Sequence, residues 1–307
     1  MATKNPSKHA ALFVFVTVVI DAMGIGIIIP VMPDLLTELS DMPISEAAIW
    51  GGYLSFVYAA MQFLFGPTIG NLSDRFGRRP VLLVSLSTLC VDYIVMGLAP
   101  TLWMLFVTRA IAGIAGATHS TANAYIADVT PPSQRSQNFG LIGAGFGLGF
   151  IFGPVIGGIA GEFGTRVPFF VAAMLAGLNV AYGAFVLPES LPTEKRRSFS
   201  WRRANPLGVA RQIAAVPAVA WFFVALFLYN LAHFVYPTIW SFYTKEAFAW
   251  TTAEIGMSLA LVGVGFAIVQ GWLIRKLIPA IGEVRTALFG FLVSIVALGG
   301  LAFAHAG

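Results

Sequence analysis

Long apolar runs separated by short polar stretches dominate the chain. They predict transmembrane helices near residues 10–32, 48–69, 80–99, 102–126, 139–161, 167–187, 216–240, 254–274 and 286–305. Each run holds about 20 residues, which is enough to cross a hydrocarbon core of roughly 30 Å. The first run is too long for a signal peptide and lacks a small-residue cleavage site. The predicted fold class is therefore an all-α, polytopic membrane protein.

The composition supports this class. Of the 307 residues, 58% are hydrophobic and 10% are charged, whereas a soluble domain carries about 25% charged residues. The net charge of +4 does not indicate nucleic-acid binding, because the basic residues serve to orient the helices. Cys90 is the one cysteine and lies in an apolar run, which excludes a disulfide framework and a CxxC metal site.

The basic residues lie mostly on one side of the predicted membrane. Fifteen of the 18 Lys and Arg residues fall in the N-terminus and in segments 71–79, 127–138, 188–215 and 275–285. The stretch 34–46 on the opposite side is purely acidic. Positive charge marks the cytosolic side, so we expect a cytosolic N-terminus.

A basic and polar segment divides the chain into two parts. We predict an N-terminal six-helix bundle over 1–187, a cytosolic linker over 188–215, and a partial C-terminal bundle of three helices over 216–307. Six spans would match the first half, so we expect the sequence to lack three final spans. A genuine nine-helix protein is the alternative.

The densest charge cluster of the first half lies between residues 70 and 80. Four charges cannot sit in lipid, so we expect a tight turn in water between two helices; they are Asp74, Arg75, Arg78 and Arg79. Gly70 and Gly77 allow backbone geometry that other residues resist. We expect Asp74 to accept hydrogen bonds from the free amides of a helix N-terminus, and Pro80 to suit the first turn of that helix.

Three charged residues fall clearly in the interior of predicted spans, where a charge is costly unless it is paired or faces water. Asp92 and Arg109 flank the short turn at Pro100 at similar depth, which predicts a salt bridge. That pair could serve transport or only hold two helices in register. Asp21 lies near the midplane without a partner nearby in the sequence, and we expect it to carry a proton or contact substrate.

Several motifs carry a resemblance to a known family. The stretch Gly70-x-Leu72-Ser73-Asp74-Arg75-Phe76-Gly77-Arg78-Arg79-Pro80 resembles the loop signature of the major facilitator superfamily. The stretch Asp21-Ala22-Met23-Gly24-Ile25-Gly26 and the later Gln62 resemble the tetracycline/proton antiporters of its drug/proton antiporter branch. The glycine-rich Gly149-x-x-x-Gly153-Pro154-x-x-Gly157-Gly158 is similar to the antiporter signature of that branch.

This resemblance implies roles for the matching residues. Asp21 and Asp92 would lie in the transport path, and Arg109 would take part in proton coupling. The cytosolic gate would comprise Gly70, Asp74, Arg75, Gly77, Arg78 and Arg79. The glycines of the fifth predicted span also let helices approach closely, and Pro154 can bend it. Tight packing without motion and a sliding interface both remain open.

The chain departs from the tetracycline pattern at two positions. Phe266 and Ser294 stand where those transporters carry a histidine and an aspartate that matter for transport. Either the substrate differs or coupling has moved to other groups, such as His119 or His233. The seventh predicted span could line a substrate cavity or simply pack. The candidate lining residues are Asn230, His233, Tyr236 and Trp240 of this span, and Phe266 of the eighth.

The expected function is proton-coupled efflux of a tetracycline-like or other amphipathic drug by alternating access, in a bacterial inner membrane. The partners would be the substrate, protons and the lipid bilayer, with no nucleic acid. We expect no cofactor, because the proton gradient supplies the energy, and no enzyme activity, because GxxxxGK[ST], HExxH and GxSxG motifs are absent from the sequence. The alternatives are a metabolite transporter of the same fold and a truncated membrane protein that does not transport.

Overall fold

A computed structural model describes residues 6–116, 118–131, 135–201, 204–206 and 217–303, and its regular elements are helices. The first part of the chain forms α1 (Pro6–Ile28), α2 (Met32–Ser40), α3 (Ile44–Phe76), α4 (Arg78–Leu98), α5 (Leu102–Ala115), α6 (Thr118–Val129), α7 (Arg135–Gly161) and α8 (Val167–Val186). The second part forms α10 (Pro217–Phe248), α11 (Thr252–Ile268), α12 (Ile274–Ile281) and α13 (Glu283–Phe303). Short 3₁₀ turns lie at Ile29–Val31 and Thr193–Lys195, and a π-helical turn lies at Val269–Leu273.

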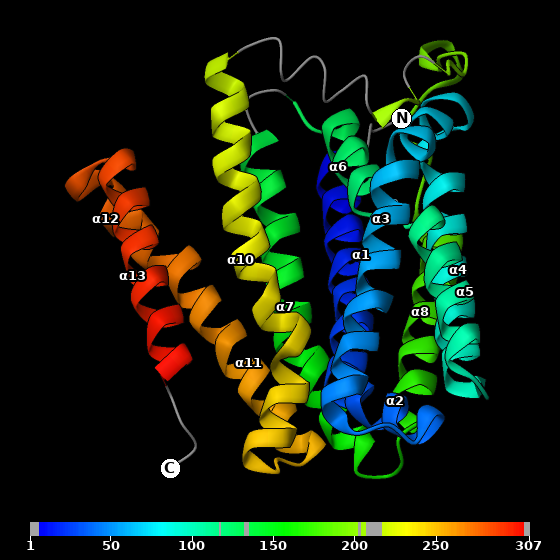
Figure 1. The fold of residues 1–307 in the computed structure, drawn as a ribbon. Coiled ribbons are helices and arrows are strands. Elements are labelled where there is room, and N and C mark those ends of the chain that lie inside the picture. Colours follow the sequence, from blue (N-terminus) through cyan, green and yellow to red (C-terminus); the bar gives the residue numbers. More distant parts are fainter. Residues whose placement is uncertain (1–5, 117, 132–134, 202–203, 207–216, 304–307) are drawn as a thin grey trace.

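The described residues include eight helices that are long and apolar enough to cross a membrane, and α11 is a shorter apolar helix. The helices run side by side between two ends (Figure 1). We call the end with the α3–α4 connection and residues 188–201 the basic end. The end with α2 and the α10–α11 connection is called the acidic end. The prediction of a polytopic, all-α membrane protein is confirmed, whereas its division into bundles of six and three helices stays a prediction.

Among the differences from the sequence prediction, two concern the expected gate and the fourth predicted span. Helix α3 continues to Phe76, so Gly70 lies in regular helix and the expected turn shrinks to Gly77, whose φ is 109°. The special backbone role that we expected for Gly70 is therefore wrong, because a polar sequence at the edge of a membrane can continue a helix. The fourth predicted span breaks at Gly116, which separates α5 from α6.

The apolar core forms two clusters inside the α1–α8 assembly. One lies toward the acidic end and includes Ile27, Leu36, Leu54, Met96 and Phe169. The other lies toward the basic end, among residues of α1, α4, α6 and α7 that include Phe13, Leu82, Leu86, Tyr125 and Ile142. The first cluster also holds Phe242 of α10, so α10 joins the core near the acidic end.

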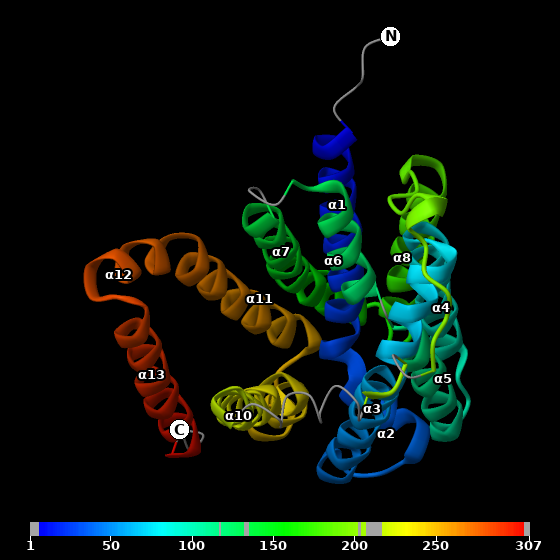
Figure 2. The same ribbon diagram turned by 90° about the horizontal axis from the view of Figure 1, so that it is seen from above.

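Helix α7 packs closely against two helices through its glycines. A Cβ placed on Gly153 would lie 2.7 Å from the carbonyl oxygen of Met23 in α1. A Cβ placed on Gly158 would lie 2.5 Å from the carbonyl oxygen of Thr252 in α11. Figure 2 shows α7 beside both partners, with α12 and α13 set apart from α1–α8. Only glycine allows such backbone approach, so these residues set the helix spacing.

The two glycines of the charged stretch allow a matched test. We predict that Gly77→Ala lowers the thermal unfolding midpoint of the detergent-purified protein, because Gly77 has φ of 109° and ψ of 162°, a conformation that costs any other residue about 1–3 kcal/mol. The added Cβ would also meet the Glu189 carboxylate. The control is Gly70→Ala, whose Cβ has open space in regular helix, and it should leave the midpoint unchanged or raise it. Equal destabilisation by both variants would contradict the prediction.

Candidate functional site

A buried ion pair joins α4 to α5. Asp92 is 3% exposed and pairs with the guanidinium of Arg109. The Arg109 guanidinium carbon also lies 5.4 Å from the centre of the Tyr58 ring in α3, within cation–π range. The salt bridge predicted from the short turn at Pro100 is thus confirmed. Both charges are balanced within the helix assembly.

Asp21, by contrast, has no ion-pair or hydrogen-bond partner among the residues that the structure describes. It is partly buried in the middle of α1. Tyr93 of α4 packs against the following turn, where a Cβ on Gly24 would lie 3.1 Å from the tyrosine hydroxyl oxygen. Asp21 also interacts electrostatically with Tyr58 and Tyr93. An uncompensated carboxylate therefore lies one helical turn from the contact of α1 with Tyr93, the residue that follows Asp92 of the ion pair.

The break between α5 and α6 provides the polar contact of Gln62. At this break the Gly116 carbonyl accepts a hydrogen bond from the Gln62 side-chain nitrogen at 2.6 Å. Close packing of α3 on α5 brings the two residues together, since a Cβ on Gly113 would lie 2.8 Å from the Met61 Cβ. His119 lies in the first turn of α6, and its side chain is outside the described residues.

These contacts bring Asp21, Gln62, Asp92 and Arg109 to one region of the assembly, around Tyr58 and Tyr93. We call this region the central polar cluster. Sequence reasoning missed both tyrosines. A signal existed, because Tyr58 is four residues before Gln62 and so shares its helix face, and Tyr93 follows Asp92 directly.

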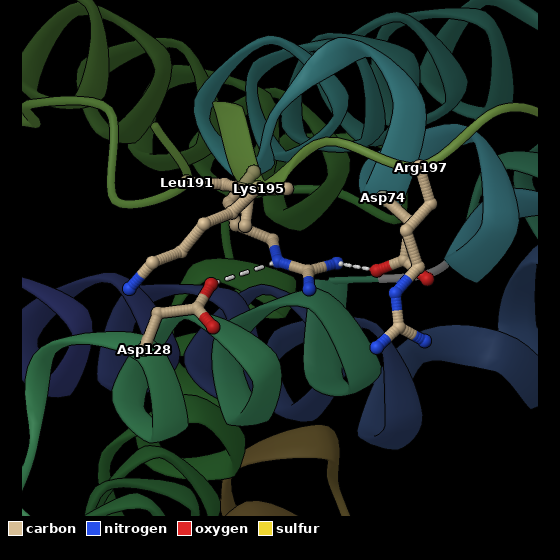
Figure 3. A pocket seen from close by; sticks show the side chains of 6 residues that line it. Asp74, Asp128, Leu191, Lys195 and Arg197 are labelled. Atoms are coloured by element: carbon tan, nitrogen blue, oxygen red, sulfur yellow. Dashed lines mark hydrogen bonds and ion pairs between the residues drawn. The ribbon is translucent and has the colours of Figure 1, made fainter. Parts of the chain in front are cut away.

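At the basic end, Arg78 bridges two helices. Its guanidinium pairs with Asp74 of α3 at 2.7 Å and with Asp128 of α6 at 3.0 Å. Figure 3 shows the two carboxylates on opposite sides of this guanidinium, with Lys195 and Arg197 flanking it. The cavity there has a volume of about 300 Å³ and is lined by Asp74, Arg78, Asp128, Leu191, Lys195 and Arg197.

The expected capping role of Asp74 is wrong. The first amides of α4 are instead held by Glu189, which follows α8: one carboxylate oxygen accepts from the Arg78 N–H at 2.8 Å and the other from the Arg79 N–H at 3.3 Å. Asp74 lies four residues before Arg78 on a nearly continuous helical path, which favours pairing of their side chains. Arg75 stacks over Phe76 at 5.1 Å instead of joining this network.

At the acidic end, three contacts tie α10 and α11 to the earlier helices. Lys245 of α10 pairs with Asp34 of α2. Glu162, just after α7, accepts hydrogen bonds from the Ala253 N–H at 3.1 Å and the Thr252 hydroxyl at 2.9 Å. Phe242 fills the space over Gly51 of α3, where a Cβ would lie 2.7 Å from the ring. We call these contacts the acidic-end clamp.

The hydrogen bond from the Ala253 amide, followed by that from Thr252, lowers the pKa of Glu162. A lowered pKa means that the contact stabilises the folded protein above the ordinary pKa of a glutamate. The stabilisation is lost as the pH falls through the lowered pKa. Near neutral pH the Glu162 carboxylate is therefore charged, and its hydrogen bonds contribute fully to the clamp.

The candidate cavity-lining residues of α10 are mostly engaged with their neighbours. Tyr236 and Trp240 have ring centres 4.6 Å apart, and the Trp240 indole N–H donates to the Ser258 hydroxyl at 2.9 Å. His233 is exposed, and its ring stacks on that of Tyr229 with the ring centres 5.7 Å apart. The Asn230 side-chain amide donates a hydrogen bond to the Leu226 carbonyl. Phe266 of α11 is exposed. Their lining of a substrate cavity stays a prediction.

Known proteins resemble this chain in sequence. Residues 14–307 match the family model described as Major Facilitator Superfamily. The chain is 39% identical over 301 residues to the tetracycline resistance protein, class C, of Escherichia coli, covering 98% of this chain and 75% of that protein. It is 30% identical to multidrug resistance protein 2 of Bacillus subtilis (strain 168), covering 92% and 70%.

A solved structure shows the same architecture. The human organic anion transporter MFSD10 (TETRAN) superposes with a TM-score of 0.68 at 25% identity, covering 88% of this chain and 73% of that one. The sequence resemblance to this family is thereby confirmed. The individual roles of the site residues stay predictions.

The Asp92–Arg109 pair leads to a stability prediction. Asp92→Leu should destabilise the protein by about 3–5 kcal/mol, because it leaves the Arg109 charge buried without a partner. Adding Arg109→Met should recover most of this loss, since neither charge then remains. Thermal unfolding of the detergent-purified variants measures both effects. An equal loss in the single and double variants would show that packing, not charge, accounts for the cost.

Proposed function

The chain belongs to the major facilitator superfamily, and we propose that this multi-pass membrane transporter exports a tetracycline-like or other amphipathic drug in exchange for protons. The observation that carries this proposal is the difference between the two buried carboxylates. Asp92 is neutralised by Arg109, whereas Asp21 has no such partner in the described part of the chain. A carboxylate in a membrane span must be protonated, paired or hydrated. Asp21 is therefore the group whose charge changes during the cycle.

The transport cycle proposed here is alternating access. The acidic-end clamp holds α10 and α11 against α2, α3 and α7, while α12 packs on the π-helical turn and α13. Figures 1 and 2 place α12 and α13 away from α1–α8. This arrangement supports a state that is closed at the acidic end. The excess of basic residues supports placing the basic end in the cytosol, with the protein in a bacterial inner membrane.

In this cycle, protonation of Asp21 biases the equilibrium between two states of the helix assembly. A ligand shifts such an equilibrium only by its differential affinity for the two states, and the proton is the ligand here. The Arg78 network with Asp74 and Asp128 acts as the cytosolic gate, because it ties α3, α4 and α6 at that end. The proton gradient serves as the energy source, and no further cofactor is required.

The names of the relatives favour an amphipathic substrate, since they include tetracycline and multidrug resistance proteins and an organic anion transporter. A metabolite transporter is the second candidate, and Phe266 and Ser294 favour it because they replace titratable residues of the tetracycline pattern. Uptake of labelled tetracycline into inverted vesicles tests the first proposal. Accumulation that collapses with a protonophore supports it, and no accumulation with the protein present favours the second candidate or a protein that does not transport.

Asp21→Asn should abolish proton-driven accumulation while leaving the amount of protein in the membrane unchanged. The amide has nearly the same shape as the carboxylate but does not exchange a proton in this pH range. A matched control is Asp41→Asn, because Asp41 is exposed at a turn with φ of 52°, where asparagine is well tolerated. Unchanged accumulation with Asp21→Asn would remove this carboxylate from the mechanism.

The acidic-end clamp should open in every cycle if access alternates. We predict that cross-linking Asp34→Cys to Lys245→Cys with a short thiol-specific reagent, in a Cys90→Ala background, reduces transport to the background level. Reduction of a cleavable cross-linker should restore it. The control variants each carry a single introduced cysteine and should transport normally after treatment. Full activity of the cross-linked protein would contradict opening at this end.

A further inference from the structure

An asparagine in α8 makes a buried polar contact with α1. The Asn179 side-chain nitrogen donates a hydrogen bond to the Thr17 carbonyl oxygen at 3.0 Å, and both residues are 0% exposed. An amide within a membrane span is costly unless it is bonded. Nothing in the central polar cluster described above uses this contact.

The Thr17 carbonyl is also part of the helical turn that carries Asp21. In an α-helix, the N–H of each residue bonds to the carbonyl four residues earlier. The Asp21 N–H therefore bonds to the Thr17 carbonyl, which has a second lone pair for the Asn179 amide. Asn179 thus binds the same carbonyl oxygen as the backbone N–H of Asp21. It does so from α8, whereas Asp92 and Arg109 belong to α4 and α5.

Two further polar atoms at this contact have no partner within the described residues. They are the Thr17 hydroxyl and the side-chain oxygen of Asn179, and both are buried. Buried polar groups are nearly always bonded, to protein or to ordered water. Helical side chains lean toward the helix N-terminus, so the Asp21 carboxylate leans toward the level of Thr17.

We propose that Asn179 is a positioning residue for Asp21: its amide holds the Thr17 carbonyl, and its oxygen and the Thr17 hydroxyl bind a water molecule beside the Asp21 turn. This inference rests on the proposed proton exchange at Asp21. The water supplies the polar surroundings in which Asp21 takes up and gives up its proton. Asn179 contacts neither the proton nor the drug, so its effect is transmitted through α1.

The first test is transport by purified protein in proteoliposomes, with tetracycline as the probe and an imposed pH gradient. Asn179→Leu removes the donor and the acceptor at similar volume. We expect a turnover about threefold to tenfold lower, which corresponds to the loss of one net hydrogen bond, and a changed pH profile. Asn179→Asp should recover most of the turnover, because a neutral carboxylic acid can still donate to the Thr17 carbonyl. The packing control is Leu175→Ala, a partly buried residue of the same helix, which should not change the pH profile.

The second test observes Asp21 without transport. Infrared spectra identify the C=O stretch of protonated Asp21 as the band that disappears in Asp21→Asn. We expect this band to move to higher frequency in Asn179→Leu and in the isosteric Thr17→Val, because each removes a partner of the water. If Asn179→Leu fails to fold, Thr17→Val carries the test alone.

The outcomes separate this inference from the proposed function. Wild-type protein without proton-coupled transport would overturn the proposed function and the inference with it. Coupled wild-type transport, together with an unchanged band in Thr17→Val and an unchanged pH profile in any folded Asn179→Leu, would overturn only the positioning role. A shifted band with reduced turnover would support it.

Discussion

The close backbone contact of α7 with α1 and α11 is the constraint on which the rest of the structure depends. Glycines on one helix face two different partners, one within the α1–α8 assembly and one that begins at the acidic end. With no water between helices in a membrane, association relies on such packing instead of on the hydrophobic effect. The α1 contact fixes the level of Asp21, and the α11 contact fixes the acidic-end clamp. One helix therefore connects the polar centre to the moving parts of the proposed cycle.

The charged residues of the central polar cluster and the basic end differ in whether they have a partner of opposite charge. Asp92 and Arg109 neutralise each other, and Arg78 is shared by two carboxylates at the basic end. Asp21 remains the exception, because it has no such partner in the part of the chain that the structure describes. The proposed proton exchange is therefore assigned to this carboxylate and not to the paired ones.

The sequence predicted the spans because about 20 apolar residues in a row have few other uses in a folded chain. It predicted the Asp92–Arg109 pair because a short turn at Pro100 forces two neighbouring helices together. It did not predict that Gly70 lies in a helix, because a glycine among charged residues is as typical of a turn as of a helix end. Nor could it predict that Glu189 binds the first amides of α4, or that Lys245 pairs with Asp34. The members of each pair are more than 100 residues apart in the sequence and meet only through tertiary packing. Asn179 is recognisable in the sequence as a lone amide in an apolar run. That pattern alone does not predict which helix its side chain contacts.

The capping box at the start of α11 has a consequence for the proposed transport cycle. Glu162 binds the start of this helix from outside, but Thr251 and Glu254 form a capping box within α11 itself. When Glu162 withdraws, the helix keeps its own cap, so the end does not fray. In the proposed cycle, separation breaks the Glu162 hydrogen bonds and the close packing of α7 on α11, and it leaves the start of α11 folded. Contact between α7 and α11 can then part and re-form through successive turnovers without refolding of the start of α11.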